Sequence, residues 1–290
     1  WKGVEDHSWV IGDFIWTAFD YIGEASIGWC GYPLDKRIFP WNHANCGDLN
    51  LSGERRPQSY LRETLWSDAP VSHIVVTPPV PSFPLNPDKA NWSVWDFPDV
   101  VDHWNFPGYE GKKMTVSVYS NCEQVELFLN GESLGKQENT ADKKNTLVWE
   151  VPYAHGILKA VSYNKGGEVG TATLESAGKV EKIRLSADRT EIVADGNDLS
   201  YITLELVDSK GIRNQLAEEL VEFSIEGDAT IEGVGNANPM SIESFVANSR
   251  KTWRGSNLLV VRSGKSSGRI IVTAKVKALP VASITITQKK

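Results

Sequence analysis

Cysteine is scarce in this sequence of 290 residues, and the cysteines that occur are widely spaced. The three are Cys30, Cys46 and Cys122, and the absence of a C-x-x-C pair argues against a structural zinc site. Cys30 and Cys46 could pair in an oxidising compartment, but free thiols are the interpretation we favour. The histidines are scattered and no H-E-x-x-H occurs, so we expect no metal site.

The signatures of several common function classes are also missing. No G-x-S-x-G, Walker loop or G-x-G-x-x-G is present, so the usual serine-hydrolase, phosphate-loop and dinucleotide motifs are excluded and we expect no cofactor. The net charge of −7 makes nucleic acid an unexpected partner. No apolar run approaches the ~20 residues that span a bilayer, so we expect no membrane partner. The chain opens on Trp1-Lys2-Gly3, without a signal-peptide pattern.

Tryptophan, by contrast, is abundant and unevenly placed. Eleven tryptophans occur, and all but Trp149 and Trp253 lie within residues 1–104. The length predicts two domains or three small ones. We therefore expect the aromatic front of the chain to differ in kind from its back.

Residues 1–70 show the pattern of a short αβ segment. Residues 10–16 form a compact apolar run, which predicts a strand buried on both faces. A long loop follows, and residues 55–66 predict a helix with Pro57 in its first turn. One strand and one helix cannot bury a core, so this segment is predicted to be the end of something larger.

The remainder of the chain predicts two antiparallel sandwiches, over residues 71–178 and 179–290. A proline-rich connector over residues 71–85 is expected to be stiff and extended and to mark a domain boundary. Alternating apolar residues then predict strands, with an Asn130-Gly131 hairpin turn between the second and third of the apolar runs. The predicted strands are 114–119, 125–129, 147–151, 158–163, 169–174, 183–186, 202–207, 221–225, 258–261, 270–274 and 284–286.

Carboxylates and aromatic residues gather at the end of the predicted first strand. Asp13, Asp20 and Glu24 lie among Trp16, Phe19 and Tyr21. Acids accept hydrogen bonds from sugar hydroxyls, and a flat ring stacks on the apolar face of a pyranose. A buried structural aspartate and packing tryptophans would give the same composition, so both interpretations stand.

Residues 9–24, W-V-I-G-D-F-I-W-T-A-F-D-Y-I-G-E, closely resemble the last barrel strand of bacterial glycoside hydrolase family 2 β-galactosidases, which carry W-T-x-F-D-Y-x-G-E there. Residues 47–57 are similar to the approach to the last barrel helix, with Asn50 where aspartate is common. Residues 103–108 and 125–131 resemble the β-sandwich after the barrel. Residues 185–189, 194–196 and 235–239 resemble a terminal immunoglobulin-like domain.

The resemblance implies a mainly β chain: two immunoglobulin-like β-sandwich domains preceded by an incomplete (β/α)8-barrel fragment with one strand, a loop and a helix. It further implies a retaining glycosidase whose acid/base and nucleophile glutamates come from earlier barrel strands. No position here matches either glutamate, so we expect no catalytic residue and an inactive isolated chain. Trp16, Asp20 and Glu24 are then expected to bind substrate, with a structural hydrogen bond as the alternative role for the two acids.

The same resemblance predicts partners and location. We expect a carbohydrate substrate, a periplasmic or extracellular bacterial location, and a front end that forms no barrel. Residues 1–70 should lie irregularly against the first sandwich, be partly disordered, or self-associate through the exposed fragment. An interpretation from another class is a non-catalytic β-sandwich module that binds carbohydrate or a protein partner.

Three further groups of residues invite functional interpretations. Aromatic residues at positions 92, 95, 104 and 106 suggest a sugar platform or, the interpretation we favour, core packing. Acidic and amide residues at positions 195, 197 and 198 could ligate calcium, but favour a polar turn. A basic group at positions 250, 251 and 254 around Trp253 predicts a solvated loop or a surface for domain docking.

Overall fold

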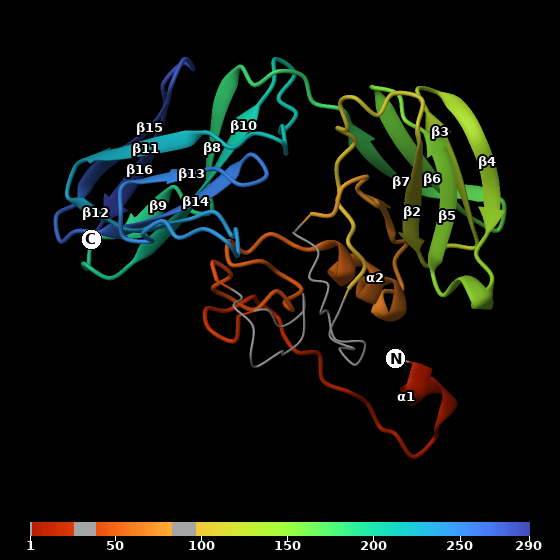
Figure 1. Cartoon of the computed structure of the whole chain (residues 1–290). Coiled ribbons are helices and arrows are strands. Elements are labelled where there is room, and N and C mark those ends of the chain that lie inside the picture. The colour runs from red at the N-terminus through yellow and green to blue at the C-terminus, as the bar shows by residue number, and fades with distance from the viewer. Residues whose placement is uncertain (1, 26–38, 83–96) are drawn as a thin grey trace.

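The computed structural model of the chain describes residues 2–25, 39–82 and 97–290. Two β-sandwiches lie side by side, and the N-terminal segment runs between and below them (Figure 1). The fold is therefore mainly β with two sandwich domains, as predicted from the sequence. No described helix is long and apolar enough to cross a membrane.

The first sandwich consists of a three-stranded sheet in the order β1-β2-β5 and a four-stranded sheet in the order β4-β3-β6-β7. All its neighbouring strands pair antiparallel. A short 3-10 helix, Ala141–Lys143, precedes β5. The strands are β1 (Ser72–Val76), β2 (Lys113–Ser120), β3 (Gln124–Leu129), β4 (Glu132–Glu138), β5 (Thr146–Pro152), β6 (Ile157–Asn164) and β7 (Gly167–Glu175).

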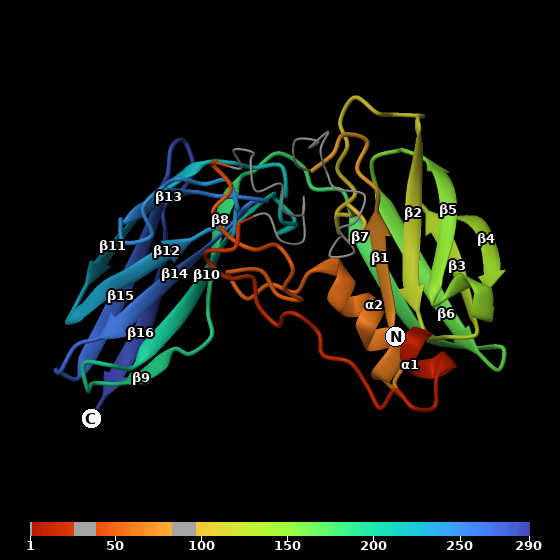
Figure 2. The ribbon, with the colours of Figure 1, turned by 60° about the horizontal axis from the view of Figure 1, so that its bottom comes forward.

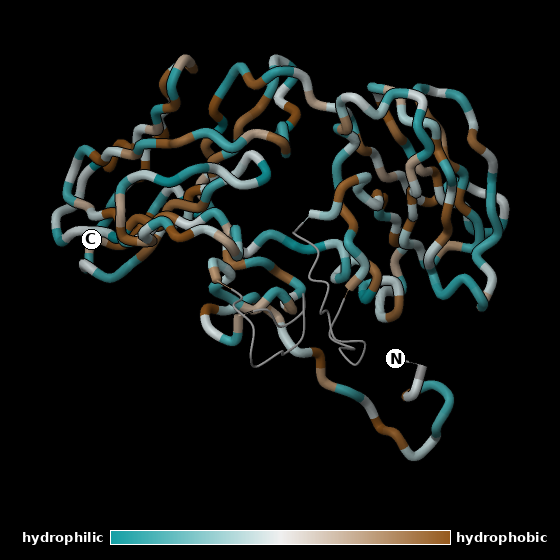
Figure 3. Tube along the Cα trace, in the orientation of Figure 1, coloured by the Kyte–Doolittle hydropathy of each residue, from teal (hydrophilic) through white to brown (hydrophobic). Residues whose placement is uncertain are grey.

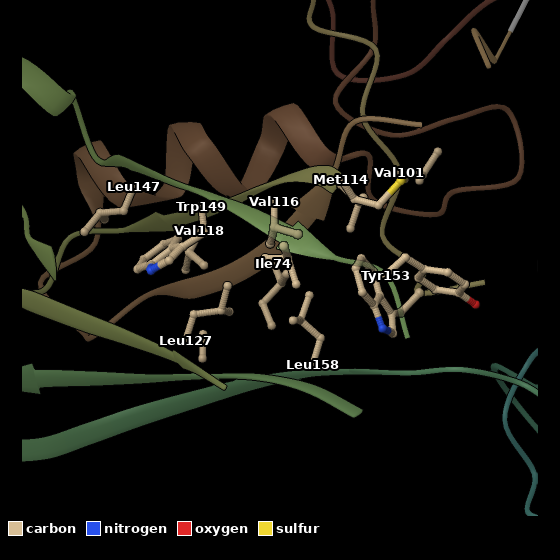
Figure 4. Close-up of a cluster of buried hydrophobic side chains, with 14 of the residues drawn as sticks. Ile74, Val101, Met114, Val116, Val118, Leu127, Leu147, Trp149, Tyr153 and Leu158 are labelled. Carbon is tan, nitrogen blue, oxygen red and sulfur yellow. The ribbon is translucent and has the colours of Figure 1, made fainter. Parts of the chain in front are cut away.

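Alternating side chains from both sheets fill the core of this sandwich. Met114, Val116 and Val118 of β2 point inward and are buried, because successive side chains of a strand face opposite sides of its sheet. Figure 4 shows Val116 on one side of this core and Leu127 and Leu158 of the opposite sheet on the other, with Ile74 between them. Leaving water stabilises each such side chain by about 1.5–3 kcal/mol.

The predicted aromatic platform is part of this core where the structure describes it. Trp104 is fully buried and Phe106 nearly so, and both pack edge-on against Tyr153. The indole nitrogen of Trp104 donates to the carbonyl of Ala154 at 2.8 Å. Core packing is thus confirmed for these two residues, whereas Trp92 and Trp95 lie outside the described residues.

The proline-rich connector begins with a strand, which corrects one expectation. Ser72–Val76 pairs with β2 as β1, and Ile74, Val75 and Val76 are buried. The prolines of the connector begin only at Pro78, whereas the residues before it are largely β-branched and suit a half-buried sheet. The extended linker predicted from residue 71 is therefore wrong for this strand.

The second sandwich has a four-stranded sheet, β12-β14-β10-β8, and a five-stranded sheet, β13-β11-β15-β16-β9. Only β9 and β16 pair parallel among its described strands. Phe223, Leu259 and Ile270 lie in its core. The strands are β8 (Lys182–Ala187), β9 (Glu191–Val193), β10 (Leu199–Val207), β11 (Leu220–Glu226), β12 (Ala229–Gly235), β13 (Ser249–Lys251), β14 (Ser256–Ser263), β15 (Gly268–Val276) and β16 (Ala282–Lys289).

The predicted helix is present as α2 (Pro57–Trp66), with Pro57 in its first turn. This helix lies against β1 and β2 (Figures 1 and 2). The ring of Tyr60 stacks on His73 with centroids 3.6 Å apart, and Asn145 donates to the hydroxyl of Thr64 at 3.1 Å. The helix is thereby fixed to the first sandwich.

The strand predicted over residues 10–16 is wrong. The described N-terminal segment has a short helix, α1 (Lys2–Asp6), and residues 10–16 then run outside any strand. Ile11 and Phe14 are each 103% exposed. Figure 3 shows hydrophobic stretches, in brown, along the N-terminal segment that leaves the body of the molecule. A strand buried on both faces needs a paired neighbour, and the described residues supply none here.

Candidate functional site

The loop after the exposed segment brings two of the three predicted sugar-binding residues together. The indole nitrogen of Trp16 donates to the hydroxyl of Tyr21 at 3.1 Å, and that hydroxyl donates to the Glu24 carboxylate. The peptide bond between Trp16 and Thr17 is cis. Trp16 is 58% exposed and Glu24 is exposed, so an indole and a carboxylate face solvent side by side.

Tyr21 is the connecting residue of this chain of hydrogen bonds. Burial, reinforced by the hydrogen bond to Glu24, raises the pKa of the Tyr21 phenol to about 12. The phenol therefore stays protonated at neutral pH and remains a donor to Glu24. Its ring also packs edge-on against Trp16, with centroids 6.3 Å apart. Trp16 and Glu24 are thus held in a defined arrangement before any ligand arrives.

Asp20 is buried, in contrast to Glu24. Its carboxylate accepts hydrogen bonds from the backbone N–H of Gly47 at 2.8 Å and from the guanidinium of Arg56 at 3.0 Å. Burial raises the pKa of Asp20 to about 6, although Arg56 acts in the opposite direction. These contacts hold the loop to the start of α2, and a substrate role for Asp20 stays a prediction.

The Gly47 turn fits tightly against this aspartate. A Cβ placed on Gly47 would lie 2.3 Å from the backbone nitrogen of Asp20, so only glycine can occupy the position. Its carbonyl accepts a hydrogen bond from Gln58 at 2.8 Å, and Arg62 pairs with Asp48. The turn is therefore anchored to α2 from several directions.

Asn50 stands where aspartate is common in the resembled family, and its hydrogen bonds explain why asparagine suits this position. Its side-chain oxygen accepts from the backbone N–H groups of Ser52 at 2.9 Å and Glu54 at 3.1 Å, as an aspartate oxygen could. Its amide nitrogen also donates to the Glu54 carboxylate at 3.2 Å, which an aspartate could not do. The substitution keeps the turn and adds a hydrogen bond.

The same segment is attached to the second sandwich. Glu54 pairs with Arg213, whose guanidinium also lies 3.8 Å from Glu205 of β10. Asn42 donates through its backbone to the carbonyl of Pro239 at 2.8 Å. Residues 42–54 therefore contact the second sandwich and α2 the first, whereas the sequence suggested contact with the first alone.

A polar cavity of about 80 Å³ lies where the three parts of the chain meet. Arg56 and Asp20 line it from the loop, Asp102 from the first sandwich, and Arg213 and Arg254 from the second. Burial acts to raise the pKa of Asp102, but Arg254 and the hydrogen bond from Gln215 outweigh it and hold that pKa below its usual value. Acidic and basic side chains balance each other in the lining of the cavity, and they come from all three parts of the chain.

The predicted basic group is divided: Arg254 and Trp253 line this junction, whereas Lys251 is exposed. Arg250 is 1% exposed and donates to the carbonyls of Val234 and Glu243, so it is not solvated. Arg254 lines the cavity. Of the two interpretations of this group, the docking surface is the one that describes Arg254.

The predicted calcium group forms a polar turn. The Asp195 carboxylate accepts from the backbone N–H groups of Asn197 at 2.7 Å and Asp198 at 2.8 Å. Asp198 pairs with Arg189 at 2.9 Å. Cys46 and Cys122 are buried free thiols, and Cys30 lies outside the described residues.

Two sandwiches joined through a helix and an aromatic–carboxylate loop are the arrangement that the resemblance to glycoside hydrolase family 2 implied. Residues 183–285 match the family described as glycoside hydrolase family 2 C-terminal domain 5, and residues 111–170 match a domain of unknown function, DUF4982. The chain belongs to glycoside hydrolase family 2 and corresponds to the C-terminal part of a protein of that family.

Individual relatives agree with this placement. A crystal structure of a family 2 glycosyl hydrolase from Bacteroides cellulosilyticus is 99% identical, with a TM-score of 0.97, over 100% of this chain and 37% of that one. Beta-galactosidase BoGH2A of Bacteroides ovatus is 31% identical over 100% of this chain and 30% of its own length. A putative beta-glucuronidase of Formosa agariphila is 29% identical over 83% of this chain and 20% of its own.

These shares show that the chain spans only about a third or less of the length of such relatives. The sequence predicted Trp16 and Glu24 as substrate-binding residues, and that role stays a prediction, whereas Arg56 was missed as the partner of Asp20. The available signal was the position of Arg56 directly before Pro57, where a helix N-terminus brings polar side chains toward the preceding loop.

Proposed function

We propose that the protein to which this chain belongs is a retaining β-glycosidase that acts on terminal β-galactosides. The observation that supports this most directly is the exposed Trp16–Tyr21–Glu24 arrangement on the segment that resembles the β-galactosidases. The match to a β-galactosidase over the full chain supports the same substrate class. In this proposal Trp16 stacks on the sugar ring and Glu24 accepts hydrogen bonds from its hydroxyls.

The chain itself contributes binding and not bond cleavage in this proposal. A retaining mechanism needs two carboxyl groups about 5 Å apart across the scissile bond, one as acid/base and one as nucleophile. Asp20 is committed to Gly47 and Arg56, and Glu24 to Tyr21, so neither is arranged for such a pair. The isolated 290-residue chain is therefore expected to be inactive.

The experiment compares the isolated chain with a longer protein that includes the preceding barrel residues. Nitrophenyl β-galactoside and nitrophenyl β-glucuronide are offered to both. We expect hydrolysis of the galactoside by the longer protein only. Activity in the short chain would overturn the proposal that this chain contributes binding and not bond cleavage. A preference for the glucuronide would overturn the assignment of galactose as the sugar.

Two substitutions in the longer protein test the assigned binding roles. Trp16→Ala should raise KM for the galactoside about tenfold, because a stacked ring stabilises by about 1.5 kcal/mol. Glu24→Gln should have a smaller effect of the same kind. Phe39→Ala, which removes an aromatic ring that is 77% exposed, is the matched control.

A further inference from the structure

A second hollow lies on the outer face of the second sandwich, separate from the polar cavity between the domains. It has a volume of about 610 Å³, within the range of small-ligand sites. One wall is the loop that carries Phe19 and residues 51–53, and the other is formed by β8, β10 and β14. Figures 1 and 2 both show this loop beside the second sandwich. We call this hollow the Phe19–Tyr201 groove.

The strand alternation of the second sandwich builds the floor of the groove. Along β10 the even-numbered residues face the core, so Tyr201 and Thr203 face outward. Thr203 lies opposite Ser186 of β8 on one side and Leu258 of β14 on the other. The floor is therefore a row of two hydroxyl groups and one apolar side chain.

Two aromatic rings stand at the groove without covering each other. Phe19 is 51% exposed and Tyr201 is 42% exposed, and neither stacks on another ring within the described residues. A ring left open to water beside a hollow is a site for an apolar surface of a ligand. The face of a sugar ring that carries axial C–H groups is such a surface.

The polar groups of the groove are mostly uncharged and unused. Within the described chain, the side-chain hydroxyls of Ser52, Ser186 and Thr203 take part in no hydrogen bond, and the same holds for Tyr201. Each can both donate and accept. This suits a ligand whose own groups are hydroxyls.

The charged groups near the groove are already paired. The Asp188 carboxylate accepts from the backbone N–H groups of Tyr201 and Arg189, each at 2.7 Å. Arg213, on the adjoining loop, is paired with Glu54 and lies near Glu205. An anionic ligand would find no unpaired cation among the residues that line the groove.

We propose that the Phe19–Tyr201 groove binds a sugar unit of a neutral glycan, in a part of the substrate remote from the bond that is cleaved. This proposal rests on the proposed function, since it assumes that the substrate is a glycan. Phe19 follows Trp16 by three residues, which is at most about 11 Å of chain. A glycan that contacts Trp16 can therefore continue along the same loop into the groove.

Binding to the 290-residue chain tests the groove without any catalysis. The probe is β-linked galactotetraose, and affinity is measured by calorimetry. Tyr201→Ala and Thr203→Val should each weaken binding about fivefold to tenfold. Phe39→Ala, an exposed aromatic outside the groove, should leave the affinity unchanged. Trp16→Ala should not change what the groove contributes to the affinity. Tyr201→Ala should therefore weaken binding by the same factor with and without Trp16→Ala.

Two results would overturn the assignment. One is an affinity for galactotetraose that is the same in the unsubstituted chain and in Tyr201→Ala, or is undetectable in both. The other is tighter binding of tetragalacturonate than of galactotetraose, because the absence of an unpaired cation predicts the opposite order.

Kinetics of the longer protein separate this proposal from the proposed function. Tyr201→Ala should raise KM for galactotetraose about fivefold and leave kcat, and the hydrolysis of nitrophenyl galactoside, unchanged. An unchanged KM for the tetrasaccharide would overturn the groove assignment. If the longer protein hydrolyses no β-glycoside while Tyr201→Ala still weakens binding to the chain, the proposed function fails and the groove assignment stands.

Discussion

The carboxylate of Asp20 lies 3.0 Å from the guanidinium of Arg56, which precedes the helix that packs on the first sandwich. Asp20 is buried, and the Arg56 side chain is 18% exposed. The pair connects the loop that carries Trp16 and Glu24 to the rest of the molecule. The position of Trp16 and Glu24 thus depends on Asp20, whose buried carboxylate is hydrogen-bonded to Gly47 and Arg56.

Asp20→Ala should destabilise the 290-residue chain by about 2 kcal/mol at pH 5. The substitution removes the acceptor for the Gly47 N–H and leaves Arg56 partly buried without its partner. Urea unfolding followed by tryptophan fluorescence measures the loss. Glu24→Gln, on the exposed side of the same loop, should change stability by less than about 0.5 kcal/mol. Equal effects of the two substitutions would contradict the structural role of Asp20.

The destabilisation by Asp20→Ala should shrink as the pH rises from 4 to 7. The pKa of folded Asp20 is raised to about 6, above its usual value of 3.8, because burial disfavours the charged form. Its contribution to stability is therefore fully present below the unfolded pKa and is lost as pH rises through about 6. Unfolding free energies of the chain and the variant across this range give the difference. A difference that grows with pH would mean that the ion pair with Arg56 outweighs burial.

His43 should make the chain sensitive to acid in the opposite direction. Burial, together with the nearby charges of Arg56 and Arg250, lowers its pKa from 6.5 to about 4. The stability it contributes is present above pH 6.5 and is lost as the pH falls toward 4. In His43→Gln the decline in unfolding free energy over that interval should be smaller. An identical decline in both proteins would show that His43 titrates normally.

Gly47→Ala should cost more than about 3 kcal/mol, because the new methyl group would collide with the backbone of Asp20 and not with a flexible side chain. Thermal unfolding of the chain measures this cost. Gly3→Ala, in α1, meets nothing within 4 Å and is the control for the same chemical change. A stable Gly47→Ala variant would show that the loop can move away from the turn.

The sequence predicted the regular elements well where one pattern governs one element. The helix of residues 57–66 combines a proline at its start with apolar residues at helical spacing, and the longer strands alternate cleanly. β9 and β13 have three residues each, too few for a period of two to be visible. β12 contains a glycine beside an irregularity in its pairing, which interrupts its alternation.

The features that the sequence predicted wrongly or not at all depend on contacts between residues far apart in the chain. Residues 10–16 have the composition of a buried strand, but a strand also requires neighbours, and the described chain offers none. Asp20 and Arg56 are 36 positions apart in the sequence, and the sequence between them contains no periodic pattern that predicts their pairing. The Phe19–Tyr201 groove joins residues from two domains, so only the folded structure brings its walls together.

The exposed apolar segment of residues 9–16 should cause the isolated chain to self-associate. Trp9 is 76% exposed, and Ile11 and Phe14 are each 103% exposed, so these side chains gain from any apolar cover that a second copy provides. Sedimentation at increasing protein concentration should show a rising average mass. Ile11→Asp with Phe14→Asp should abolish the rise without lowering the unfolding temperature of the sandwiches, since neither residue contacts their cores. Val281→Asp, at an exposed apolar position of the second sandwich, is the control and should still associate. A chain that remains monomeric at high concentration would contradict this expectation.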